Sequence, residues 1–133
     1  MKAKILVVED ETPLALMMAF LLSRVGYDVT TARTGQEGMD LATTTKFDLI
    51  LLDVDLNGFE ICRELKQRWI SHRTPIIFLS GNALEERRAK ASELGAADFI
   101  AKPFTADGFL ERVEFYISSA QADGTTTATK GAA

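Results

Sequence analysis

Four sets of polar residues that could do chemistry together each follow a short apolar run. Glu9-Asp10 follows ILVV, Asp53 follows DLILL, Ser80 follows PIIFL and Lys102 follows DFIA. Apolar runs of this length are typical of buried parallel strands, and an open α/β sheet binds ligands beyond the carboxyl ends of its strands. We therefore expect these side chains to meet in one cleft.

The three carboxylates of this set would repel one another unless a cation lies among them. Mg²⁺ prefers oxygen ligands and takes one or two carboxylates, so Asp10 and Asp53 are candidate ligands, together with a backbone carbonyl. An aspartate can also attack phosphorus and form an aspartyl phosphate when a metal neutralises the incoming charge. Asp53 is the candidate nucleophile because its strand is expected at the centre of the sheet.

Lys102 and Ser80 would complete a phosphoryl-transfer site by supplying a point charge and a hydroxyl donor for phosphoryl oxygens. Each signal has an ordinary structural interpretation. An acidic pair after a strand often caps a helix, Ser80-Gly81-Asn82 is a common turn, and surface lysines are frequent. Their joint occurrence, each at a predicted strand end, favours the shared site.

The elements that must position these groups alternate between short strand-like and longer helical patterns, which indicates repeated βαβ units. The predicted strands are 4–8, 28–32, 49–52, 76–79 and 97–101. The predicted helices run from Thr12-Pro13 to about 24, over 35–43, from 58 onward, and over about 84–94 and 106–119. LILL is apolar throughout, which predicts a central strand, whereas 28–32 alternates and predicts an edge strand.

Capping residues support these boundaries. Thr12 is expected to cap the first helix with Pro13 at its first position, and Thr34 with Glu37 forms a capping-box pattern for the second. Gly95 is expected to end the fourth helix in the left-handed conformation.

Composition restricts the class of protein. A chain of 133 residues with a net charge of −4 and pI near 5.0 predicts one domain without a basic surface for direct nucleic-acid binding. The longest apolar stretch, 14–22, is too short to span a bilayer, and the amino terminus lacks a secretory signal pattern, so we expect a cytoplasmic location. The single cysteine, Cys62, is expected to pack rather than react.

The motifs VVED, LILLD, FLSG and KPF together resemble the receiver domain of two-component response regulators, over about residues 3–119. The resemblance implies a flavodoxin-like, doubly wound, five-stranded parallel sheet of order 2-1-3-4-5 with five helices. It implies that a sensor histidine kinase or histidine phosphotransfer protein phosphorylates Asp53. The domain would assist only its own phosphorylation and dephosphorylation, and would otherwise not be an enzyme.

The same resemblance assigns the metal ligands. Asp10 would bind Mg²⁺ directly with Asp53, Glu9 would act through water, and the backbone carbonyl of Asp55 would complete the protein ligands. Most receivers have Asp-Asp where this chain has Glu9-Asp10, and we expect the longer acid to alter water-mediated metal contacts without abolishing activity.

The resemblance also implies a conformational switch. Ser80 would be the switch hydroxyl, Lys102 the phosphate-binding lysine, and Phe99 the aromatic residue that swings inward as Ser80 moves. The surface of helix four, strand five and helix five would then control a downstream protein, or form a phosphorylation-dependent homodimer. Gly81, where alanine is common, is expected to loosen the end of the switch strand.

One stretch departs further from the family pattern. Receivers usually read Asp-x-x-Met-Pro-x-Met-Asp-Gly, whereas Asp53-Val-Asp-Leu-Asn-Gly58 reaches its glycine three residues early. We expect this short loop to be the place where metal binding and phosphate access differ most from related receivers.

Two alternatives remain at this stage. LILLDVD also matches the Asp-x-Asp signature of haloacid dehalogenase-like Mg²⁺-dependent phosphatases, although there the signature lies on the first strand and the acidic pair comes late. The other alternative is an interaction module that keeps the fold but signals without phosphate.

The domain prediction is a receiver over 1–119 followed by a disordered tail or linker over 120–133, because QADGTTTATKGAA has no apolar periodicity. The chain is expected to be either a stand-alone regulator or a receiver cut from a longer protein.

Overall fold

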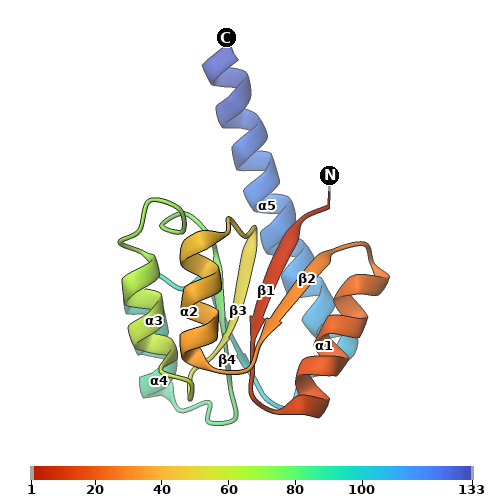
Figure 1. The fold of residues 1–133 in the computed structure, drawn as a ribbon, viewed down its shortest axis with the longest axis vertical. Helices are drawn as coiled ribbons and strands as arrows, with labels where there is room; N and C mark the ends of the chain where they lie inside the picture. The colour runs from red at the N-terminus through yellow and green to blue at the C-terminus, as the bar shows by residue number, and fades with distance from the viewer. Residues whose placement is uncertain (1, 133) are drawn as a thin grey trace.

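The computed structural model describes residues 2–132, with side chains described through residue 120. Within that range five strands and five helices alternate (Figure 1). The strands are β1 Lys4–Val8, β2 Asp28–Ala32, β3 Leu49–Asp53, β4 Ile76–Ser80 and β5 Asp98–Ala101. The helices are α1 Thr12–Arg24, α2 Gly35–Thr44, α3 Gly58–Leu65, α4 Glu85–Glu93 and α5 Ala106–Ala132.

All strand pairs are parallel, and the sheet has the order β2-β1-β3-β4-β5. The register pairs Val8 with Leu52 and Ser80 with Ala101, so the carboxyl ends of neighbouring strands lie along one edge. The predicted flavodoxin-like, doubly wound fold and its strand order are confirmed. β3 and β4 each run one residue further than predicted, so Asp53 and Ser80 are the last residues of their strands.

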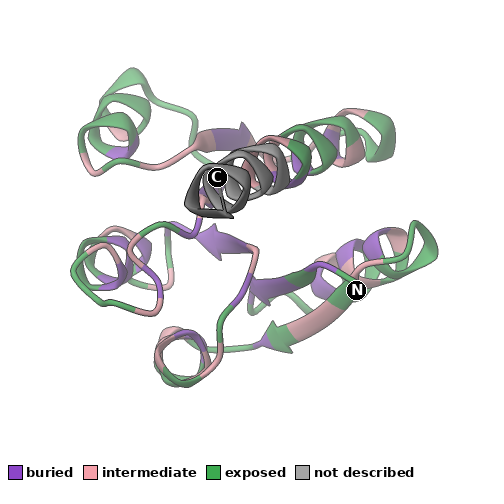
Figure 2. Ribbon diagram, turned by 90° about the horizontal axis from the view of Figure 1, so that it is seen from above, coloured by how far each residue is buried: buried purple, intermediate pink, exposed green. Residues whose placement is uncertain are grey.

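The helices cover both faces of the sheet, α2, α3 and α4 on one side and α1 and α5 on the other (Figures 1 and 2). Alternate residues of each central strand enter the two resulting cores, as Leu6 and Ile5 of β1 do. Every residue of β3 is buried, whereas β2 is mostly half-buried or exposed. This confirms the predicted central and edge positions.

The start of α1 differs from the prediction. The N-cap residue is Glu11, and Thr12 is already helical, so Pro13 lies at the second helical position. The Thr12 hydroxyl accepts a hydrogen bond from the Arg33 guanidinium instead of capping the helix. The tertiary contact with Arg33 therefore replaces the local capping bond.

The start of α2 is close to the predicted capping box. The Thr34 hydroxyl accepts from the Glu37 backbone N–H at 3.1 Å, as expected. The Glu37 carboxylate, however, accepts from the Arg33 backbone N–H at 2.8 Å, one residue before the cap. At the end of α4, Gly95 has φ +88°, which confirms the left-handed stop.

The last helix is longer than predicted. α5 is assigned over Ala106–Ala132, whereas the sequence predicted a helix end near Ser119. The predicted tail or linker over 120–133 lies almost entirely outside the residues whose side chains are described, and it stays a prediction. Among the described residues no helix is both long and apolar enough to cross a membrane.

Cys62 of α3 is fully buried in the core between this helix and the sheet, which confirms the predicted packing role. Burial raises the pKa of its thiol, so the reactive thiolate is disfavoured.

Gly38 of α2 lies against β1 so closely that a side chain would collide with it. A Cβ at this position would come within 2.7 Å of Val8 Cγ2. We predict that Gly38→Ala lowers the free energy of unfolding by about 1 kcal/mol. Overpacking costs about 1–3 kcal/mol, which outweighs the gain of about 1 kcal/mol from the higher helix propensity of alanine. Urea unfolding measures this.

The control is the same substitution in a Val8→Ala background, which removes the opposing methyl groups. There Gly38→Ala should become neutral or stabilising. A loss of equal size in both backgrounds would contradict the packing explanation.

Candidate functional site

Three carboxylates meet at the carboxyl edge of the sheet, as predicted. Glu9 and Asp10 directly follow β1, Asp53 ends the neighbouring strand β3, and one oxygen from each lies within 4.8 Å of the others. Glu9 and Asp53 are buried and Asp10 is exposed. A hydrogen bond from the Glu9 backbone N–H to Ala32 O, at 2.9 Å, extends the β1–β2 pairing up to the site.

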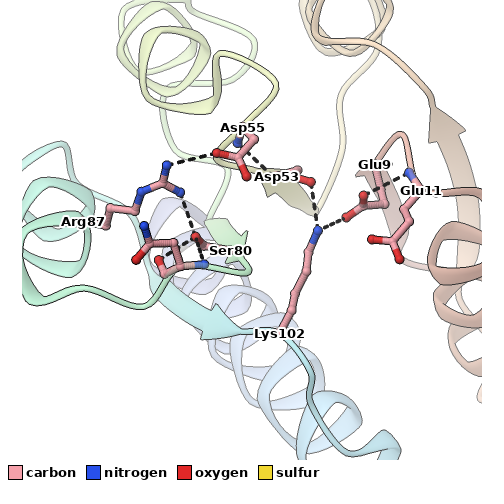
Figure 3. A network of polar contacts seen from close by, with 8 residues as sticks. Glu9, Glu11, Asp53, Asp55, Ser80, Arg87 and Lys102 are labelled. Atoms are coloured by element: carbon pink, nitrogen blue, oxygen red, sulfur yellow. Dashed lines mark hydrogen bonds and ion pairs between the residues drawn. The ribbon is translucent and has the colours of Figure 1, made fainter.

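Lys102 reaches into this group from the loop after β5 (Figure 3). Its Nζ lies 2.7 Å from Glu9 Oε1 and 2.9 Å from Asp53 Oδ2. The Lys102 backbone N–H donates to Ser80 O at 2.8 Å, which anchors the residue at the end of β4. The predicted convergence of strand ends therefore includes the lysine.

The electrostatics of this contact favour charged Lys102. Burial by itself acts to lower the Lys102 pKa, but the contacts with Glu9 and Asp53 outweigh it and raise the pKa overall. For Glu9, burial raises the pKa, opposed by the bond to Lys102 and by the Glu11 backbone N–H, which donates to Glu9 Oε2 at 3.1 Å. The contact with Lys102 thus favours the ionised form of Glu9, and the contacts with Glu9 and Asp53 favour the charged form of Lys102.

The donor set fits a hard divalent cation. One ammonium faces three carboxylates, so two negative charges remain when all three are ionised. The cluster offers only carboxylate oxygens, and exposed Asp10 leaves it open to solvent. These are features that Mg²⁺ sites use, since the ion keeps several of its waters.

Ser80 and Asp55 lie beside this group and are joined by a residue that we did not anticipate. Asp55 N–H donates to Asp53 Oδ1 at 2.9 Å, which directs the loop after β3 toward the acidic cluster. The Asp55 carboxylate turns toward Arg87 of α4, and Arg87 also donates to Ser80 Oγ (Figure 3).

Sequence reasoning missed Arg87 and Arg33, whose guanidinium donates to Asp10 O at 3.1 Å. Neither residue follows an apolar run, and basic side chains are common on protein surfaces. The usable signal for Arg87 was its place early in the helix after Ser80, but its neighbour Arg88 shares that signal and points instead over the Phe99 ring.

Phe99 is already buried, with 5% of its surface exposed. The Arg88 guanidinium lies 4.9 Å from the ring centre, and Arg112 donates to Phe99 O at 3.2 Å. Phe99 is therefore buried in this structure without the inward swing that the resemblance implied.

The loop between β3 and α3 closes as two overlapping turns. Leu56 N–H donates to Asp53 O at 3.2 Å and Gly58 N–H to Val54 O at 3.0 Å. Asn57 has φ +60°, and a Cβ on Gly58 would approach Asp53 O to 2.7 Å. The glycine is thus required at the start of α3 by its close approach to the end of β3.

The metal role of the Asp55 carbonyl stays a prediction.

The parallel sheet of order 2-1-3-4-5 is a flavodoxin-like fold, and its strand ends carry an anionic site of three carboxylates that could hold a cation. The chain belongs to the response regulator receiver domain family, whose profile matches residues 5–114. It is thus a receiver domain of two-component systems, as the motifs indicated, and the phosphatase alternative is set aside.

Individual relatives agree with this assignment. The chain is 42% identical over 108 residues to the alkaline phosphatase synthesis transcriptional regulatory protein PhoP of Bacillus subtilis (strain 168). That match covers 79% of this chain and 44% of PhoP, so the chain spans less than half the length of that relative.

Two solved structures show the same fold. A CheY-like receiver domain protein from Methanospirillum hungatei JF-1 has a TM-score of 0.86 and 25% identity, over 92% of this chain and 99% of that one. The receiver domain of sensor histidine kinase PA1611 from Pseudomonas aeruginosa PAO1, solved with a magnesium ion in its active-site cleft, has a TM-score of 0.80 and 30% identity, over 89% and 99%.

We predict that Lys102→Met destabilises the metal-free protein by about 3–5 kcal/mol, because breaking a buried ion pair leaves uncompensated charge. Urea unfolding at neutral pH with a chelator measures this. Adding Glu9→Gln to the Lys102→Met variant removes one of the stranded charges and should restore part of the loss. If the double variant is no more stable than Lys102→Met, the ion pairs do not explain the effect.

Proposed function

We propose that Asp53 accepts a phosphoryl group from a sensor histidine kinase or histidine phosphotransfer protein in a reaction that requires Mg²⁺. The observation that carries this proposal is the position of Asp53, buried at the end of the central strand β3, within 2.9 Å of Lys102 and beside two further carboxylates. The magnesium ion in the active-site cleft of the PA1611 receiver domain supports it.

Asp10 and Asp53 would hold the ion, with Glu9 acting through water and the Asp55 carbonyl as a further ligand. When bound, Mg²⁺ supplies positive charge against the incoming phosphoryl oxygens. The fit rests on the three converging carboxylates.

The residues of the chain would divide the work of transfer. An Asp53 carboxylate oxygen forms the new bond to phosphorus while the bond from phosphorus to the donor breaks. Lys102 already donates a hydrogen bond to Asp53. After transfer it would donate to a phosphoryl oxygen, which carries the added negative charge. The Ser80 hydroxyl, at the end of the adjacent strand, would supply a second donor.

The output would be a shift between two conformations, driven by contacts that the phosphoryl group makes in only one of them. We place the output on the surface formed by α4, β5 and α5, which would dock a downstream protein or a second copy of the chain. A hollow of about 230 Å³ lies there, and its lining includes Arg88, Ala101, Phe104 and Arg112. Both arginines also contact Phe99, which links this surface to β5.

Treatment with acetyl phosphate and Mg²⁺ should add one phosphoryl group to the wild-type protein and none to Asp53→Asn, because the amide is not a competent nucleophile. Intact-protein mass spectrometry reads this directly. Asp40→Asn, the same substitution on an exposed part of α2, is the matched control and should be phosphorylated normally. No gain in the wild type would refute the phosphoacceptor role, and intact partner binding would then favour the phosphate-independent interaction module.

Mg²⁺ should raise the melting temperature of the wild type, since a ligand that binds only the folded state stabilises it by about 1.4 kcal/mol at roughly ten times its Kd. Differential scanning fluorimetry measures the shift, which should be several degrees. Asp10→Asn should remove most of it, whereas Asp28→Asn, an exposed aspartate of β2, should not. An equal shift in both variants would place the ion elsewhere.

A further inference from the structure

Arg87 joins two segments on either side of the proposed phosphorylation site. Its Nη1 donates to Ser80 Oγ at 2.9 Å and its Nη2 to Asp55 Oδ1 at 3.0 Å (Figure 3). One planar guanidinium thus connects α4 with the end of β4 and with the loop after β3. We call this pair of contacts the Arg87 bridge. The Arg87 side chain is 28% exposed, so the bridge is partly sheltered from water.

The bridge helps to saturate the Ser80 hydroxyl. A hydroxyl has one proton to donate and two lone pairs. Ser80 Oγ donates to Asn82 O at 2.7 Å and accepts from the Asn82 backbone N–H at 3.0 Å and from Arg87 at 2.9 Å. Because both lone pairs are taken, the proton is directed at Asn82 O and away from Asp53.

The other end of the bridge acts on Asp55. This carboxylate is 63% exposed, and its pairing with Arg87 is the ion pair that the structure describes for it. Its backbone N–H is bonded to Asp53 Oδ1 at 2.9 Å, so the loop is held to the acceptor at one end and to α4 at the other. Movement of Ser80 toward Asp53 would therefore have to break a contact that also anchors this loop.

We propose that Arg87 is a positioning residue that holds the domain in its unphosphorylated conformation through this bridge. The proposal rests on Asp53 as the phosphoacceptor. For the Ser80 hydroxyl to donate to a phosphoryl oxygen, it must release Asn82 O, and the Arg87 bridge opposes that release. An interaction made in only one of two conformations shifts the population toward it. Loss of the bridge therefore favours the conformation that accepts and retains phosphate.

The first test compares rates of phosphorylation by acetyl phosphate with Mg²⁺. Arg87→Ala should be phosphorylated about five-fold faster than wild type, the factor that corresponds to one net hydrogen bond. Loss of a positive charge near the site would by itself slow reaction with an anionic donor, so an increase cannot come from charge. An equal or lower rate in Arg87→Ala would overturn the proposal.

The matched control is Lys90→Ala, which removes the same charge from the same helix. Lys90 is exposed and makes none of the side-chain hydrogen bonds described for residues 2–120. Its rate should stay within about two-fold of wild type. An acceleration in Lys90→Ala equal to that in Arg87→Ala would also overturn the proposal, because the effect would then not depend on the contacts of the Arg87 bridge.

The second test needs no phosphate and keeps the two proposals distinguishable. A double-mutant cycle of Ser80→Ala and Arg87→Ala, read by urea unfolding of the unphosphorylated protein, should show non-additive changes of at least about two-fold in the unfolding constant. Additive changes would refute the bridge. If wild type and Lys90→Ala both fail to take phosphate, the phosphoacceptor role of Asp53 fails, and the cycle alone then decides whether the bridge exists.

Discussion

The mutual repulsion of three carboxylates at one edge of the sheet is the constraint on which the site depends. Glu9 and Asp53 are buried, where an unpaired charge is costly, and Lys102 lies between them at 2.7 and 2.9 Å. Lys102 follows β5, which is separated from β1 by two strands, β3 and β4. β1, β3, β4 and β5 must therefore be in place before Lys102 can contact Glu9 and Asp53, which links folding of the core to formation of the site.

The two hydrophobic layers make that assembly rigid. β1, β3 and β4 send alternate residues into both cores, so each strand end is held from two sides. Glycine permits close approaches of neighbouring elements, among them Gly38 against Val8 and Gly58 against the end of β3. Close packing on both faces fixes the position of Asp53, and only the loops beyond the strand ends remain free to adapt.

Those loops are where the proposed switch lies. Ser80, the last residue of β4, exchanges hydrogen bonds with Asn82 and accepts one from Arg87, while Asp55 is drawn to the same arginine. Each of these bonds is local and weak compared with the core. A phosphoryl group on Asp53 could therefore redirect them without disturbing the sheet, and α4 would carry the change to the α4–β5–α5 surface.

The amino-acid sequence by itself determined the parallel sheet and the meeting of Glu9, Asp10, Asp53 and Lys102 at one edge, with Ser80 beside them, whereas the strand order was implied by the resemblance of the motifs to receiver domains. Each of these polar groups follows an apolar run, and parallel strands bring their carboxyl ends to one edge. Only the tertiary structure decided the hydrogen bonds of Ser80, the burial of Phe99, the start of α1 after Glu11 and the contacts of Arg87. These depend on side chains brought together from distant elements, as Arg33 with Thr12 and Arg87 with Asp55, and such contacts leave no periodic trace in the chain.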